Sequence, residues 1–485
     1  MVETRRYVFA PLEQRGVVAG LRAGQVGLLG AGLVVDVGLL RAMPDIAGVA
    51  AAGVVMLAAT AAAFVAIAGR PVEQWAPTVT RRACRVLTGA HRTTPRGRRS
   101  PTPGSMMPIP SAFAGLKFDE VPRVGASPMG VVRDGTTGTL TAVLAVRGRS
   151  FTLLDAVDKE RRLASWSAVL AGLSREGGPV RSLQWVERTV PGDSDALVRH
   201  FDEAAVVRAD TPAGRSYMEL IAEAGPLGQE HECFVALTIR GPRRHNPQAV
   251  DAMLLREVRL LEGQLRSAEV DVDHALSRRE LGGVLRTAFD PRARTAIGRR
   301  RALHADLDGP LPDGAWPAST EESWSWWRTD ETWHATFWVA EWPRSEVSAD
   351  FLTPLLLHAA GQRTISVVMR PLPPSAGVRE AEAARTAQVA DDDLRQRAGF
   401  LATARRRREG EGIARREAEL SDGHAAYRFS GYVTVTAADR QQLEVACGEV
   451  IQAAHQCRLE LRLLHGAQDL AFAWTLPFGR GLAGR

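Results

Sequence analysis

The chain has 485 residues, of which 45% are hydrophobic and 24% are charged, with a formal net charge of +6. This length excludes a single small core and predicts two or three domains of ordinary globular composition. The charge alone does not indicate nucleic-acid binding: Lys117 and Lys159 are the only lysines, and the arginine excess is typical of a GC-rich genome. The four cysteines form no CxxC pair and no zinc-type cluster, which indicates free thiols in a reducing compartment: Cys84, Cys233, Cys447 and Cys457.

The N-terminal region, residues 1–90, predicts a membrane hairpin. Residues 46–69 contain no charge, and a helix of that length exceeds a bilayer core of about 30 Å. Residues 24–42 are apolar except for Asp36 and Arg41, and Pro44 breaks the chain between the two spans. The alternative for the second span is a buried helix of a soluble domain.

Arginines predict the orientation of this hairpin. They are dense before the first span and after the second, whereas the connecting turn has only Arg41 against Asp45. Positive flanks favour the cytoplasmic side, so we expect both termini in the cytoplasm and two spans in the inner membrane. Candidates for contact with anionic lipid headgroups, if they are not simply solvated, are Arg81, Arg82, Arg96, Arg98 and Arg99.

Asp36 is the one acidic residue inside a predicted span. A carboxylate is costly there unless it faces protein or water. Two interpretations stay open: a position near the wet interface, or an intramembrane contact with another subunit. Residues 91–112, rich in Pro, Gly, Ser and Arg, then predict a linker that cannot fold alone.

Residues 113–300 predict a first α/β domain. The order is strand (138–147), helix (155–177), strand (181–190), strand (232–241), helix (247–268) and strand (269–273), with a partly helical excursion at 192–227. That order, βαββαβ, is the split arrangement of ferredoxin-like domains. A further helix is predicted at 277–290.

Residues 301–485 repeat the pattern and predict a second α/β domain. Strands are expected at 333–342, 364–373, 427–437 and 458–466, with helices at 348–361 and 438–457 and a charged helical insertion at about 377–420. The predicted fold class is therefore α+β: a two-helix transmembrane hairpin followed by two ferredoxin-like (βαββαβ) units, each with a helical insertion between its second and third strands. An internal duplication explains the repeated order.

Six tryptophans lie within residues 319–343. A stacking platform for bases needs basic residues between the rings, but the neighbours here include Glu321, Glu322 and Glu341. Both faces of 333–342 are apolar, which predicts a strand covered on both sides. We therefore interpret the tryptophans as core residues of a hairpin that turns at Asp330 and Glu331.

The stretch 391–420 predicts one charged helix. A solvated face with i,i+4 pairs is the plain interpretation, and a docking surface for a partner is the alternative. The residues that would form that surface are Arg405, Arg406, Arg407, Arg408, Arg415 and Arg416.

Chemical motifs are weak. The sequence contains no GxxxxGK[ST], GxSxG or HExxH motif, so we predict no catalytic residue, no cofactor and no metal ligand. Asp271, Asp273 and His274 lie close together in sequence, but a solvated strand end explains them better than a metal site. A DxD spacing also occurs at Asp306 and Asp308.

Several segments, taken in order, resemble parts of conjugation machines. "YVFAPLEQRGVVAGLRAGQ" followed by two spans is similar to PrgI-like two-helix membrane subunits. "VLAVRGRSFTLLDAVDKERRLASWSAVLAGLSREGGPVRSLQWVERT", "TWHATFWVAEWP" and "RREAELSDGHAAYRFSGYVTVTA" resemble the N-terminal domain of VirB-type ATPases, which lacks the nucleotide site. As an ordered set they resemble an actinobacterial family of conjugation-associated membrane proteins that joins both parts.

The resemblance implies a non-enzymatic structural subunit of a type IV secretion-like DNA-transfer apparatus. "QDLAFAWTLPFGRGL" corresponds to the segment that leads into the motor domain of the ATPases, but this sequence ends at Arg485, so no ATP hydrolysis is carried over. The expected partners are other subunits of the complex and a separately encoded ATPase, docked at the charged helix and at the C-terminal residues 470–485. We expect an oligomer; direct contact with nucleic acid stays open. The alternatives are an inner-membrane core component of a type VII secretion system and a membrane-tethered enzyme such as a glycosyltransferase.

Overall fold

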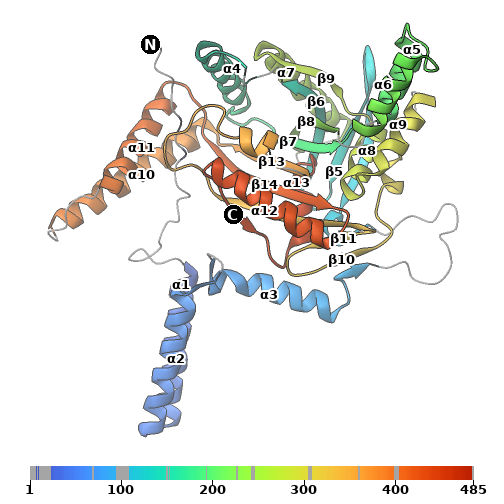
Figure 1. Ribbon diagram of the computed structural model, residues 1–485. Helices are drawn as coiled ribbons and strands as arrows, with labels where there is room; N and C mark the ends of the chain where they lie inside the picture. The colour runs from blue at the N-terminus through green and yellow to red at the C-terminus, as the bar shows by residue number, and fades with distance from the viewer. Residues whose placement is uncertain are drawn as a thin grey trace. The chain divides into compact units, whose positions relative to one another are not determined.

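The computed structural model describes residues 7, 9, 23–67, 70–93, 109–148, 151, 153–192, 194–224, 228–241, 246–303, 309–358, 361–397 and 404–482. Its contacts divide the chain into two compact units (Figure 1). The anchor unit is centred on residues 11–92, and the sheet unit holds most of the remaining chain. Each unit is described by itself.

The anchor unit contains two apolar helices, α1 (Ala23–Ala42) and α2 (Ile46–Phe64), followed by α3 (Val72–Leu87). Asp45 caps α2, because its carboxylate accepts a hydrogen bond from the N–H of Gly48 at 2.9 Å. Both α1 and α2 are long and apolar enough to cross a membrane, and most of their side chains are exposed. Leu57 is 72% exposed, for example, which fits a helix whose apolar surface faces lipid. The predicted second span was too long, since α2 ends at Phe64.

The sheet unit is built on one large antiparallel sheet that contains the 12 strands β4 to β15. Its central order is β10-β11-β12-β14-β13-β7-β8-β6-β5-β4, with β15 also paired to β12 and β9 to β6. The strands of the first half are β4 (Leu116–Arg123), β5 (Ala126–Asp134), β6 (Thr139–Gly148), β7 (Val180–Pro191), β8 (Gln229–Arg240) and β9 (Val270–Ala275). Those of the second half are β10 (Thr320–Glu322), β11 (Trp327–Thr329), β12 (Thr332–Glu341), β13 (Gln362–Pro371), β14 (Tyr427–Ala437) and β15 (Glu460–Leu463).

The two halves repeat one arrangement. A hairpin, β4–β5 or β10–β11, precedes four strands whose spatial order is β9-β6-β8-β7 in the first half and β15-β12-β14-β13 in the second. Counted along each half, both orders read fourth, first, third, second. The halves meet at a seam where β7 pairs with β13, from Thr364 opposite Arg188 to Met369 opposite Leu183.

Helices cover both faces of the sheet. On one face, α4 (Ala156–Leu173) and α7 (Pro247–Ser267) pack on the first half, while the π-helical turn η4 (Pro354–His358) and α12 (Arg440–Gln456) pack on the second. On the opposite face lie α8 (Arg278–Phe289) and α13 (Gln468–Thr475). The remaining helices are α5 (Ser194–Ala204), α6 (Pro212–Ala224), α9 (Ala293–Leu303), α10 (Pro374–Arg397) and α11 (Ala404–Ser421).

The tryptophan-rich stretch forms the expected hairpin. β11 and β12 pair around the turn at Asp330 and Glu331. Trp327 is only 2% exposed and packs on Phe472 of α13, with ring centroids 4.9 Å apart. β12 carries apolar side chains on both faces, with Phe337 in one core cluster and Trp338 against another. The core interpretation is confirmed for this strand and for Trp327, but it is wrong for Trp324, which is 38% exposed.

Two of the helices expected from the sequence differ from the helices in the structure. Among the described residues of 348–361 only the turn η4 forms, because Pro354 has no N–H to donate to a preceding helical turn. The single charged helix over 391–420 is instead shared between α10 and α11, which lie side by side and are joined by an ion pair between Arg385 and Glu417 (Figure 1).

Candidate functional site

Asp36 lies on the face of α1 that packs against α2. It is 7% exposed, and Gly32, one turn earlier on the same face, comes close to Ala59 of α2. Asp36 Oδ1 is buried and has no hydrogen-bond partner among the described residues. The carboxylate is therefore turned into the helical hairpin.

The arginines expected at lipid headgroups are only partly described. Arg81 and Arg82 lie on α3, and Arg96, Arg98 and Arg99 fall outside the described residues. Both described arginines have interaction partners. Their contact with lipid stays a prediction.

The charged arm, defined as α10 and α11, carries the expected docking residues. Arg407 and Arg415 are exposed, and Arg416 is half-buried. The backbone of Arg405, Arg406 and Arg408 lies in α11, and their side chains are outside the described part of the chain. The arm is inserted between β13 and β14, the second and third strands of its half, just as α5 and α6 stand between β7 and β8.

The C-terminal segment, residues 468–482, does not offer a free docking surface, so that expectation is wrong. Phe472, Leu476 and Phe478 are each 2% exposed and belong to the core of the sheet unit. Arg480 holds the end of the segment by an ion pair to Asp134 on β5 at 2.9 Å. The segment therefore packs into the core of the sheet unit and is not available to dock a partner.

A row of buried polar side chains receives this segment. Gln184, on the seam strand β7, donates its amide to the carbonyl oxygens of Trp474 and Leu476 at 3.0 and 2.8 Å. Ser366, on the facing strand β13, also donates to the Trp474 carbonyl, at 3.1 Å. The other members of this polar row, all at most 1% exposed, are Thr141, Thr238, Thr336 and Thr434. Sequence reasoning missed the row, whose only signal is Thr, Ser and Gln at inward positions of otherwise apolar strands.

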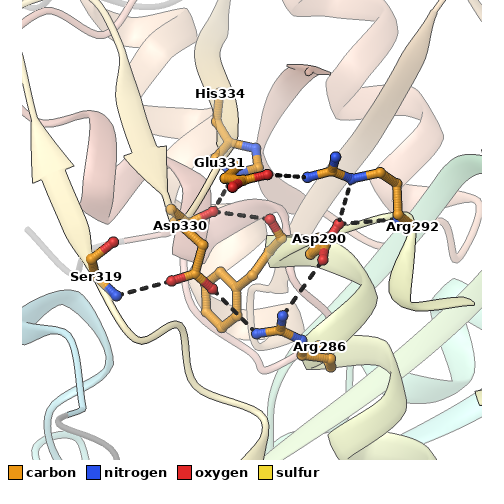
Figure 2. Close-up of polar contacts among 9 residues, drawn as sticks. Arg286, Asp290, Arg292, Ser319, Asp330, Glu331 and His334 are labelled. Atoms are coloured by element: carbon orange, nitrogen blue, oxygen red, sulfur yellow. Dashed lines mark hydrogen bonds and ion pairs between the residues drawn. The ribbon is translucent and has the colours of Figure 1, made fainter. Parts of the chain in front are cut away.

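A second polar group, the polar junction, ties α8 to the β11–β12 hairpin (Figure 2). Asp330 accepts hydrogen bonds from the backbone N–H of Ser319 at 2.9 Å and from Arg286 at 3.4 Å. Arg292 bridges Asp290 and Glu331, at 3.3 and 3.4 Å. Each carboxylate of the junction thus has an arginine partner, an arrangement that holds two elements together.

His334 is buried within this region and is uncharged. Its Nε2 lies 2.7 Å from the hydroxyl of Thr329, which itself donates to the Phe289 carbonyl at 2.9 Å. Since that hydroxyl has one proton, Nε2 donates to Thr329 and Nδ1 accepts from Thr436 at 3.0 Å. Complete burial lowers the pKa of His334 to about 3.

Two of the Asp and His residues at 271–274, Asp273 and His274, are held in ion pairs. Asp273 pairs with Arg147 at 2.9 Å, and His274 lies 2.6 Å from Glu280, the capping residue of α8. The hydrogen bond that His274 donates to the Glu280 carboxylate raises the pKa of His274. No group of three or more metal-ligating side chains occurs among the described residues. Asp306 and Asp308 fall outside them.

A cavity of about 690 Å³ lies where β12 and β14 meet the start of α12. Its lining includes Arg292 of the polar junction together with Thr332, Gln362, Thr436 and Asp439. Asp439 is the N-cap of α12 and accepts from the N–H of Gln442 at 2.8 Å, while Arg292 is paired as described above. Arg292 and Asp439 at this opening therefore serve the local structure.

No protein-family model matches the chain, and no curated protein matches it significantly.

Proposed function

We propose that the chain is a non-catalytic, membrane-anchored structural subunit of a type IV secretion-like conjugative DNA-transfer apparatus. It would lie in the inner membrane with both termini in the cytoplasm and serve there as a platform for a separately encoded ATPase. The observation that carries the membrane part is the exposed apolar surface of α1 and α2.

The halves of the sheet unit support the likeness to the N-terminal domain of VirB-type ATPases. The first half has the βαββαβ element order, the second half has the turn η4 in place of its first helix, and both halves have the spatial strand order fourth, first, third, second. We propose that each is a ferredoxin-like unit and that the two arose by duplication. The matching insertions, α5–α6 and the charged arm, support the same interpretation.

A platform has to transmit force without coming apart, and the contacts between the halves support such a role. The seam β7–β13 is reinforced on the α4 side by an ion pair between Lys159 and Asp350 at 3.0 Å. On the opposite face, Gln184 and Ser366 are both bound to the C-terminal segment. Cross-links on both faces of one continuous sheet favour a single rigid body.

The charged arm is the element that we propose as the ATPase-docking surface. Arg407 and Arg415 are exposed. Arginine is suited to this role, because its planar guanidinium forms bidentate pairs with carboxylates of a partner.

The proposal is tested by capture of the ATPase. The full chain, purified from membranes of a host that carries its operon, should retain a hexamer-forming ATPase and show no ATP turnover of its own. Reversing the charge of Arg405, Arg406, Arg407 and Arg408 should weaken capture while the melting temperature stays unchanged. The matched control reverses four arginines away from the arm and should leave capture intact: Arg147, Arg208, Arg215 and Arg440. Equal capture by both variants would remove the arm from the proposal, and intrinsic hydrolysis by the pure chain would overturn the platform role.

A further inference from the structure

Four arginines gather at one end of the central strands of the sheet. They lie on four adjacent strands in the order β8, β7, β13 and β14, and we call them the four-arginine cluster: Arg240, Arg181, Arg370 and Arg428.

The register of the sheet brings these residues together. Arg370 and Arg428 are direct cross-strand partners. Arg370 follows Met369, which pairs with Leu183, so it lies beside the start of β7 where Arg181 stands. The backbone N–H of Arg240 donates to the Pro179 carbonyl at 3.0 Å, which sets Arg240 beside Arg181. The paired residues Arg370 and Arg428 have Cβ atoms about 5 Å apart, a distance at which like charges repel.

Carboxylates do not balance this cluster. Arg428 pairs with Glu380 at 3.1 Å, whereas Arg181, Arg240 and Arg370 have no ion pair among the residues that the structure describes. One Arg370 amine donates to the Leu482 carbonyl at 2.7 Å, and its buried Nε has no hydrogen-bond partner there. Four guanidinium groups and one carboxylate leave three positive charges.

Burial and mutual repulsion lower the pKa of two of these groups, Arg370 and Arg181. Burial and then the charges of Arg181, Arg428 and Arg240 lower the pKa of Arg370. Burial and then the charge of Arg240 lower the pKa of Arg181. Like charges placed together in the absence of an anion reduce stability, a cost that proteins accept at functional sites.

We propose that the four-arginine cluster binds an anion with two or more linked phosphate groups. The guanidinium fork matches phosphate oxygens in bidentate geometry. One phosphate carries about two negative charges, so a single group leaves the cluster positive and two linked groups balance it. The source of the phosphates is free pyrophosphate or the tail of a nucleotide.

A nucleic-acid strand fits the cluster less well. Strands of nucleic acid are held by basic grooves interleaved with aromatic platforms. The nearest aromatic side chains on β14 are already engaged: Phe429 packs on Trp342 with centroids 5.2 Å apart, and the Tyr427 hydroxyl donates to the Leu170 carbonyl at 2.5 Å. Recognition at this end of the sheet is therefore by charge and hydrogen bonding.

The test uses the full chain in detergent at low salt, titrated with pyrophosphate by calorimetry and followed by thermal melting. We expect binding and a rise in Tm with pyrophosphate, and a smaller rise with sulfate at equal ionic strength. ATP and tripolyphosphate form a second arm: equal affinity indicates recognition of phosphates alone, and tighter ATP binding indicates a nucleotide. Equal effects of sulfate and pyrophosphate would mean an adventitious ion only and would overturn the proposal.

Two substitutions separate binding from structure. Arg240→Gln, at an exposed position, and Arg181→Gln should each weaken pyrophosphate binding about tenfold, as expected for a lost charge-assisted pair. Without anion, their Tm should equal or exceed that of the wild type, because repulsion is relieved. The control Arg440→Gln, which removes an exposed arginine paired with Glu444, should leave binding unchanged. A lower Tm without anion, unchanged affinity, or preferential capture of a single-stranded oligonucleotide would contradict the proposal.

Discussion

Gly479 donates its backbone N–H to the Oε1 of Gln184 at 3.0 Å, and this bond fastens the C-terminal segment to the seam between the halves. Gly479 has φ of +74°, and an added Cβ would overlap the hydroxyls of Thr238 and Thr141. Glycine is required there for both its conformation and its size. The C-terminal segment, residues 468–482, is therefore part of the fold.

Gly479→Ala should destabilise the sheet unit by about 2–4 kcal/mol, through backbone strain and overpacking. Thermal and urea melts of the full chain in detergent measure the effect. Gly448→Ala is the matched control, because Gly448 is exposed on α12 with open space around it, and alanine there should stabilise by about 0.5–1 kcal/mol. Equal stability of both variants would show that the segment is not held as described.

The tryptophans of the β11–β12 region should differ in their contribution to stability. Trp327 is 2% exposed and contacts Phe289 and Phe472, so Trp327→Ala should cost about 3–5 kcal/mol. Trp324 is 38% exposed, and its replacement by alanine should change the unfolding midpoint little. If Trp324→Ala destabilises as much as Trp327→Ala, the burial assigned to this hairpin is wrong.

His334 should make the protein sensitive to acid. Its pKa is about 3 in the folded state, against an ordinary value of 6.5. Between these two pH values the unfolded state therefore binds a proton at His334 and the folded state does not. Above pH 6.5 the buried His334 does not lower the free energy of unfolding. Below pH 6.5 the free energy of unfolding falls by about 1.4 kcal/mol per pH unit. His334→Gln should flatten the decline of Tm between about pH 6.5 and pH 4, and replacement of the exposed His200 should not. Parallel curves for the wild type and His334→Gln would exclude a buried neutral histidine.

The orientation of the anchor unit in the membrane can be tested by cysteine labelling. In a chain without its native cysteines, a cysteine at Met43, in the turn between α1 and α2, should react with an impermeant thiol reagent in intact cells. A cysteine at Ser111 should be protected, and so should the native Cys84, which is exposed on α3, when it alone is restored. Labelling at Ser111 with protection at Met43 would reverse the orientation.

The periodicity of hydrophobic residues predicted many of the helices and strands correctly. The strand expected at 427–437 is β14 with the same bounds, and the helix expected at 247–268 is α7 to within one residue. Such elements are long and strongly periodic, and local sequence determines them.

Other elements could not be read from sequence. β4 and β5 contain Pro122 and Pro128, which interrupt the alternation expected of strands; β4 tolerates its proline next to a bulge at the sheet edge. The sequence of the C-terminal segment predicts an apolar helix, but it does not indicate the surface on which the helix packs. The polar row and the four-arginine cluster depend on strand register, which places residues such as Gln184 and Ser366, 182 positions apart, in contact.

DNA transfer in a strain that lacks this chain tests the central claim most directly. Deletion of its gene in frame should reduce conjugative transfer to background, and the intact chain supplied in trans should restore it. A chain without residues 23–64 should fail to restore transfer, because the platform would no longer be held at the membrane. Normal transfer in the deletion strain, or full rescue by the chain without the hairpin, would contradict the account.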